Sequence, residues 1–107
     1  MYNIKIVYYE VNFDNDFHIT NLHLKFKNNE PDKLDNYKAS TIIFAALNKT
    51  TFFSDNGSKR LDITRNEKRP NIYDISIKVN TGDITSTDIG KFIDYLQSQI
   101  DTIDFKF

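Results

Sequence analysis

The stretch that decides the fold is ITSTDIGKFIDYLQSQIDTI, residues 84–103. Thr85 followed three residues later by Asp88 matches a capping box that opens a helix, and Ile84 precedes it at the spacing of a hydrophobic staple. One helical face then collects apolar residues, namely Ile89, Phe92, Ile93, Leu96, Ile100 and Ile103. The stretch predicts an amphipathic helix packed on a β-sheet. Gly90 should weaken this helix by about 1 kcal/mol relative to Ala, and its small size suggests close packing there.

Five segments upstream of this helix show the patterns of β-strands. They are 2–13, 17–27, 50–54, 58–65 and 72–79. The second has one apolar and one polar face, which is typical of a half-buried strand. The first has apolar residues on both faces, which indicates either a central strand or a bulge that swaps faces near residue 7. Asn56 and Gly57 supply the positive φ angles of a tight hairpin turn between 50–54 and 58–65.

A second helix is predicted after the turn at residues 28–32. Pro31 or Asp32 can open it. Its expected face consists of Leu34, Tyr37, Thr41 and Phe44, and is thickened by Ile42, Ala45 and Ala46. Residues 42–47 could instead form a buried strand, since periodicity does not separate the two over so short a stretch. The alanines at 45 and 46 favour the helix.

These elements predict one α+β domain, residues 1–107, in the order β-β-α-β-β-β-α. Hairpins between neighbouring strands imply an antiparallel sheet of about five strands, with the two helices packed on one face. A chain of 107 residues with 39% hydrophobic content is long enough to bury such a core.

Composition excludes several kinds of chemistry. There are no cysteines, which removes disulfides, thiolate metal ligands and a cysteine nucleophile. His18 and His23 are five apart on a strand and point to opposite faces, a poor arrangement for one metal. Residues 14–16 resemble the start of a calcium loop but lack its glycine and distal glutamate. No nucleotide-binding, hydrolase or metalloprotease motif is present. We therefore expect no enzyme activity, no cofactor and no metal.

Two groups of residues are candidates for partner binding. Five aromatic residues crowd the first hairpin, namely Tyr2, Tyr8, Tyr9, Phe13 and Phe17. Not all of them can face one small core, so an outward patch is expected. A basic segment, 59–69, follows the Asn56–Gly57 turn, where Arg60 falls opposite Phe53. The predicted partner-binding residues are Tyr9, Phe13, Phe53, Lys59, Arg60, Arg65, Lys68 and Arg69.

We predict from these features a small non-enzymatic protein-binding module. The abundance of Asn, Lys, Ile and Asp indicates an AT-rich coding bias, which low-GC bacteria and their phages carry. A small, cysteine-free, motif-free chain with this bias suits an inhibitor of the anti-defence or immunity type, carried by a phage or mobile element and acting by surface occlusion. A homodimer is a further prediction. The alternative is a nucleic-acid-binding module using 59–69, although the net charge of −1 argues mildly against it.

The predicted localisation is cytoplasmic, without a membrane partner. No apolar run approaches the roughly 18 residues needed to span a bilayer. The first residues lead directly into a strand pattern, so we expect no signal peptide.

Overall fold

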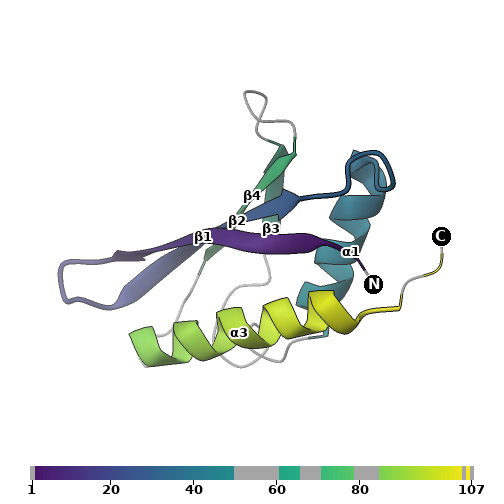
Figure 1. Cartoon of the computed structure of the whole chain (residues 1–107). Helices are drawn as coiled ribbons and strands as arrows, with labels where there is room; N and C mark the ends of the chain where they lie inside the picture. The colour runs from purple at the N-terminus through teal and green to yellow at the C-terminus, as the bar shows by residue number, and fades with distance from the viewer. Residues whose placement is uncertain (1, 50–60, 66–70, 79–84, 105, 107) are drawn as a thin grey trace.

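A computed structural model describes residues 2–49, 61–65, 71–78, 85–104 and 106. The elements in chain order are β1 (Ile4–Phe13), β2 (Ile19–Asn28), α1 (Asn36–Asn48), β3 (Leu61–Arg65), β4 (Ile72–Lys78) and α3 (Ser86–Thr102). The strands form one sheet in the order β1-β2-β4-β3, and all neighbouring pairs are antiparallel (Figure 1). Among the described strands, β1 and β3 are therefore the two edges of the sheet.

The predicted α+β class, with two helices and an antiparallel sheet, is confirmed. The strand number was wrong for the described part of the chain, where the sheet has four strands rather than about five. The remaining predicted strand, 50–54, and the turn at residues 56 and 57 lie outside the described residues. The described elements otherwise follow the predicted order.

The core lies between one face of the sheet and both helices. Alternate residues of the two central strands are fully or almost fully buried, namely Leu22, Leu24 and Phe26 in β2 and Tyr73, Ile75 and Ile77 in β4. They form a single cluster with the buried side chains of α1 and α3, so both helices cover the same sheet face, which we call the helix side (Figure 1). The opposite face, the open face, carries the polar residues of these strands.

β1 contains the bulge that its mixed pattern suggested. Ile6 lies opposite Phe26, whereas Tyr8 lies opposite Lys25, so Val7 is an extra residue. The extra residue shifts the alternation, because one inserted residue moves every later side chain to the other face. The alternative reading of β1 as a central strand is wrong, since β1 lies at the sheet edge.

The start of α3 is as predicted. The Thr85 side chain accepts a hydrogen bond from the Asp88 N–H, and the Asp88 carboxylate accepts one from the Thr85 N–H. Ile89, Phe92, Leu96 and Ile100 form the buried stripe. The suggestion of close packing at Gly90 was wrong, because a Cβ there would meet no atom within 4 Å. Ile84, the expected staple residue, lies outside the described residues.

Residues 42–47 belong to a helix, not a strand. α1 begins later than predicted, with Asp35 as its N-cap. Its expected face was partly wrong: Tyr37 is 76% exposed, whereas the predicted Ile42 and Ala46 are buried. Ala39, Ile43 and Leu47 are buried beside them. Ala39 and Ala46 lie in the contact with the core, where their small side chains let the helix approach closely. The large aromatic ring of Tyr37 lies outside this contact.

Candidate functional site

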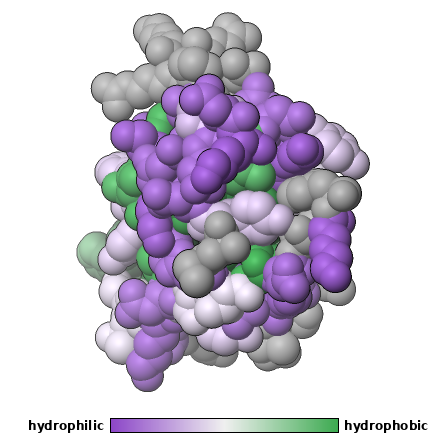
Figure 2. Space-filling model, turned by 45° about the vertical axis from the view of Figure 1, so that its right-hand side comes forward, coloured by the Kyte–Doolittle hydropathy of each residue, from purple (hydrophilic) through white to green (hydrophobic). Residues whose placement is uncertain are grey.

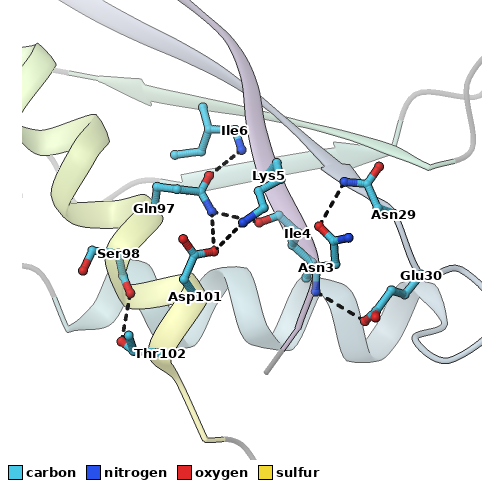
Figure 3. Close-up of polar contacts among 10 residues, drawn as sticks. All are labelled: Asn3, Ile4, Lys5, Ile6, Asn29, Glu30, Gln97, Ser98, Asp101 and Thr102. Atoms are coloured by element: carbon cyan, nitrogen blue, oxygen red, sulfur yellow. Dashed lines mark hydrogen bonds and ion pairs between the residues drawn. The ribbon is translucent and has the colours of Figure 1, made fainter.

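Described residues hydrogen-bond to the outward main-chain groups of β1 along only part of the strand. At its beginning, the side chain of Gln97 from α3 pairs with the main chain of the strand. Gln97 Nε2 donates to the Ile4 carbonyl at 3.0 Å, and Gln97 Oε1 accepts from the Ile6 N–H at 2.7 Å (Figure 3). These are the two kinds of bond that a neighbouring strand would make. The amide therefore closes the segment 4–6, which we call the proximal edge.

Two charged residues hold Gln97 in this orientation. Gln97 Nε2 also donates to Asp101 Oδ1 at 2.9 Å, and Lys5 Nζ lies 2.9 Å from the same oxygen (Figure 3). Only the nitrogen of the amide can donate to both the Ile4 carbonyl and Asp101, so the oxygen must face Ile6. The proximal edge is thus closed by a locked side chain.

The next part of the edge has no such partner among the described residues. Tyr9, Val11 and Phe13 direct their main-chain N–H and C=O groups away from β2. In the described part of the chain, no hydrogen bond reaches these outward groups. We call the segment 9–13 the distal edge. Unpaired strand edges can accept another strand.

Large apolar side chains surround the distal edge. The exposed fraction is 48% for Tyr9, 51% for Phe13 and 85% for Phe17, and we call these three residues the hairpin patch. Val7 and Tyr8, just before them, are also exposed. The β1–β2 hairpin extends past the N-terminal end of α3 in Figure 1, which fits this exposure. The face of the molecule in Figure 2 is by contrast mostly hydrophilic, with apolar side chains showing between hydrophilic ones.

The turn of the hairpin holds Phe17 in an unusual conformation. Phe17 has a φ of 63°, the left-handed region that an L side chain rarely adopts. Such a residue costs about 1–2 kcal/mol. The Asp14 carboxylate offsets this cost by accepting bonds from the N–H groups of Asp16 and His18, each at 2.9 Å. The turn is therefore held in shape while its aromatic side chain faces solvent.

Asp14, Asp16 and His18 also form a cluster of candidate metal ligands. Their donor atoms lie within 4.8 Å of one another, and all three residues are exposed. One oxygen of Asp14 is already engaged by the two turn amides. The His18 N–H in particular lowers the pKa of Asp14 below its usual range. We assign this cluster to the structure of the turn.

The open face brings a histidine and a carboxylate together. His23 Nε2 lies 3.4 Å from Asp74 Oδ1, and this oxygen is buried without a hydrogen bond. Glu10 and Ser76 lie opposite His23 on the two neighbouring strands. Sequence reasoning missed Asp74, because only the register of β2 against β4 places it there. The pair lies on the open face of the sheet, among side chains from three neighbouring strands.

A ring and a cation lie next to this pair. Lys25 Nζ is 5.3 Å from the centre of the Tyr8 ring, within the range of a cation–π contact. Desolvation and the Glu10 carboxylate raise the pKa of Tyr8.

A shallow, open depression lies elsewhere, lined by Tyr2, Asn3, Lys5, Glu30 and Asp101. Most of its polar groups bond to one another.

The predicted site residues divide into three groups. Tyr9 and Phe13 are exposed on the hairpin, as an outward patch requires. Arg65 ends β3, at the edge of the sheet opposite β1, so the structure does not bring it to the hairpin. The others lie outside the described residues, namely Phe53, Lys59, Arg60, Lys68 and Arg69. Phe17 was among the crowded aromatics, but nothing in the sequence marked its left-handed backbone.

No protein-family model, curated protein sequence or solved structure matches this chain. The geometry of the hairpin and the open face therefore carries the functional argument. Among the helices of the described residues, none combines the length and apolar character that crossing a bilayer requires.

Proposed function

We propose that this protein is a small non-enzymatic protein-binding module whose β1–β2 hairpin covers a surface of its partner. The observation that carries the proposal is the hairpin patch: Tyr9, Phe13 and Phe17 are about half to mostly exposed on one projecting hairpin. Aromatic side chains supply much of the binding free energy at protein interfaces.

The shape of the hairpin supports binding with little loss of entropy. β1 and β2 are paired along nearly their full length, and the Asp14 carboxylate ties the turn. A binding surface that is already ordered loses less conformational freedom when its partner arrives. A non-glycine residue kept at positive φ also fits this role, since strained residues persist at functional sites.

Within this class, we propose an inhibitor that acts by occlusion. A single hairpin with exposed rings can block a partner surface without any chemistry of its own. We retain the anti-defence or immunity type, carried by a phage or mobile element and acting in the cytoplasm, as the proposed setting.

The alternative of nucleic-acid binding stays a prediction. Its basic segment, 59–69, lies outside the described residues except for β3, Leu61–Arg65. It predicts binding to DNA or RNA that weakens steeply with salt. Titration of a fluorescent oligonucleotide at low and high salt tests it.

Affinity capture from a host lysate tests the proposed function. The wild-type protein should recover a stoichiometric protein, and the double variant Phe13→Ser, Phe17→Ser should reduce the recovered amount at least ~10-fold. Tyr37→Ser is the matched control, because Tyr37 is an aromatic residue on α1 that is 76% exposed. Equal recovery by the hairpin variant would contradict the proposal, and so would a wild-type protein that recovers no stoichiometric partner.

A further inference from the structure

We propose that the distal edge of β1 binds an extended segment of the partner as an added strand. This inference rests on the proposed function and specifies its binding mode. The partner segment carries apolar residues on the side of Tyr9 and Phe13 and basic residues on the side of Glu10.

The direction of the main-chain groups follows from bonds on both sides of the segment. Ile4 and Ile6 bond outward to Gln97, before the bulge. After it, the Asn12 carbonyl accepts from Thr20 Oγ1, toward β2, and the Asp14 N–H donates to the His18 carbonyl. Because neighbouring residues of a strand bond to opposite sides, the residues alternating with 12 and 14 bond outward. The outward groups are those of Tyr9, Val11 and Phe13.

Gln97 shows what this edge accepts and where an added strand must stop. Its amide already makes the pair of bonds that a strand would make at the proximal edge. From residue 9 onward, no described residue bonds to the outward groups of this edge. An added segment therefore has about five residues of β1 to pair with, a length typical of short strands.

The side chains around the distal edge define the chemistry of the added strand. Tyr9, Val11 and Phe13 lie opposite the buried Leu24, Leu22 and Ile19 of β2, so they share the helix side. Their exposed surfaces would pack against apolar residues of the new strand. On the open face, Glu10 lies at the edge, and Asp14 and Asp16 follow in the turn. Basic residues are favourable beside these carboxylates.

A second copy of the chain fits less well. Antiparallel pairing of two distal edges about their midpoint, residue 11, brings Glu10 of each copy beside Asn12 of the other. It brings no Lys or Arg to the acidic turn, where His18 Nδ1 lies 3.5 Å from Asp14 Oδ2. Pairing about residue 10 places the two Glu10 side chains directly opposite, which is unfavourable. We therefore assign the edge to a basic, amphipathic partner strand.

Selection of peptides from a random 12-residue display library on the immobilised protein tests the inference. The expected peptides alternate apolar residues with Lys or Arg. Val11→Pro should weaken their binding at least ~10-fold, because proline lacks the outward N–H. Proline is tolerated at edge positions whose N–H faces solvent, and circular dichroism would verify the fold of this variant.

N-methylation of the selected peptides gives the same test without altering the protein. Methyl groups on one alternate set of peptide nitrogens should abolish binding, and methyl groups on the other set should leave it unchanged, because only one set faces β1. Equal tolerance of both sets would overturn strand addition. Equal peptide affinity for Val11→Pro and for the wild-type protein would also overturn strand addition.

The outcomes separate this inference from the proposed function. If Phe13→Ser, Phe17→Ser abolishes partner binding while Val11→Pro leaves it unchanged, the hairpin binds through side chains alone and strand addition is wrong. If no hairpin variant changes partner binding, the proposed function fails as well. Sedimentation showing a dimer that Val11→Pro dissociates would assign the edge to a second copy and overturn the partner strand.

Discussion

The two halves of the β1 edge belong to one strand and treat their main-chain groups in opposite ways. At the proximal edge, Gln97 occupies the outward groups of Ile4 and Ile6. At the distal edge, the outward groups of Tyr9 and Val11 have no partner among the described residues. The bulge at Val7 separates the two halves.

A small domain can thus keep only part of a sheet edge available. A helix that lies under an edge strand can close it with one amide side chain. The closed half contains the fully buried Ile4, whereas the open half carries rings that are about half exposed. The proximal half of the strand thus contributes to the stability of the fold, and the distal half carries the proposed binding surface.

Removing the amide should have the largest effect. Gln97→Ala leaves a part-buried N–H and C=O without partners, which should lower the free energy of unfolding by about 1–3 kcal/mol. Urea denaturation measures this change. The Ile6 amide should also exchange with solvent faster, approaching the rate of the outward Tyr9 amide, as seen by NMR hydrogen exchange.

Ser98→Ala is the matched control for this variant. Ser98 is the next residue on α3 and is exposed, so its loss should leave both readouts nearly unchanged. An unchanged Ile6 exchange rate in Gln97→Ala would show that the amide does not close the proximal edge.

Stabilising α3 should increase the difference in amide protection between the proximal and distal edges. Gly90→Ala should raise the free energy of unfolding by about 0.5–1 kcal/mol, because alanine has the higher helix propensity. The new methyl group meets open space. The Ile6 amide should become better protected, while the Tyr9 amide stays unprotected. A less stable variant in urea denaturation would contradict this account.

The ion pair that orients Gln97 should matter less. Lys5 and Asp101 are each more than one-third exposed in their side chains. Asp101→Asn keeps an oxygen that can accept from Gln97 but removes the charge, so the expected loss is about 0.5 kcal/mol or less. The loss should shrink further at high salt. Urea denaturation measures this loss of unfolding free energy. A larger loss that does not depend on salt would show that the orientation of the Gln97 amide depends on more than the charge of Asp101.

Acid should slightly lower the free energy of unfolding through two carboxylates, one at the start of α3 and one in the hairpin turn. The Thr85 N–H lowers the pKa of Asp88 at the start of α3, and the His18 N–H lowers that of Asp14 in the hairpin turn. Because the folded pKa lies below the ordinary 3.8, the ionised groups stabilise the fold above that pH. This contribution is lost as the pH falls through the folded pKa.

Urea denaturation across this pH range would test the assignment. Asp88→Asn and Asp14→Asn should each flatten the decline in stability below pH 3.8. Asp94→Asn is the control, since Asp94 is exposed on α3 away from the cap. A decline as steep in the two variants as in the wild type would contradict the role of these carboxylates.

Local signals predicted the parts of the fold that depend on local contacts. The α3 cap was readable because Thr85 and Asp88 are three residues apart, and the bulge because both faces of β1 are apolar. The buried face of α1 was only partly predicted. The ring of Tyr37 suggested burial but is 76% exposed, whereas Ala39, which the periodicity did not assign to this face, is buried.

The candidate site depended on contacts that a sequence does not display. Gln97 lies 91 residues from its partner Ile6, and nothing in the helix pattern distinguishes it from Gln99. The pairing of His23 with Asp74 needs the register of two strands that are far apart in the chain. The number of aromatic residues predicted that some rings of the hairpin are exposed, because one small core has no room for all of them. It did not distinguish the rings that are buried from those that are exposed.

The bulge at Val7 also bears on the solubility of the protein at high concentration. Fibrils with a cross-β structure grow from long, flat strand edges that stack copy upon copy. An inserted residue bends the strand and increases its twist, so the two halves of β1 do not present one straight edge. Deleting Val7 would leave the other β1–β2 pairs in register. We expect that deletion to make the protein more prone to aggregation during storage, even though it removes only one exposed side chain.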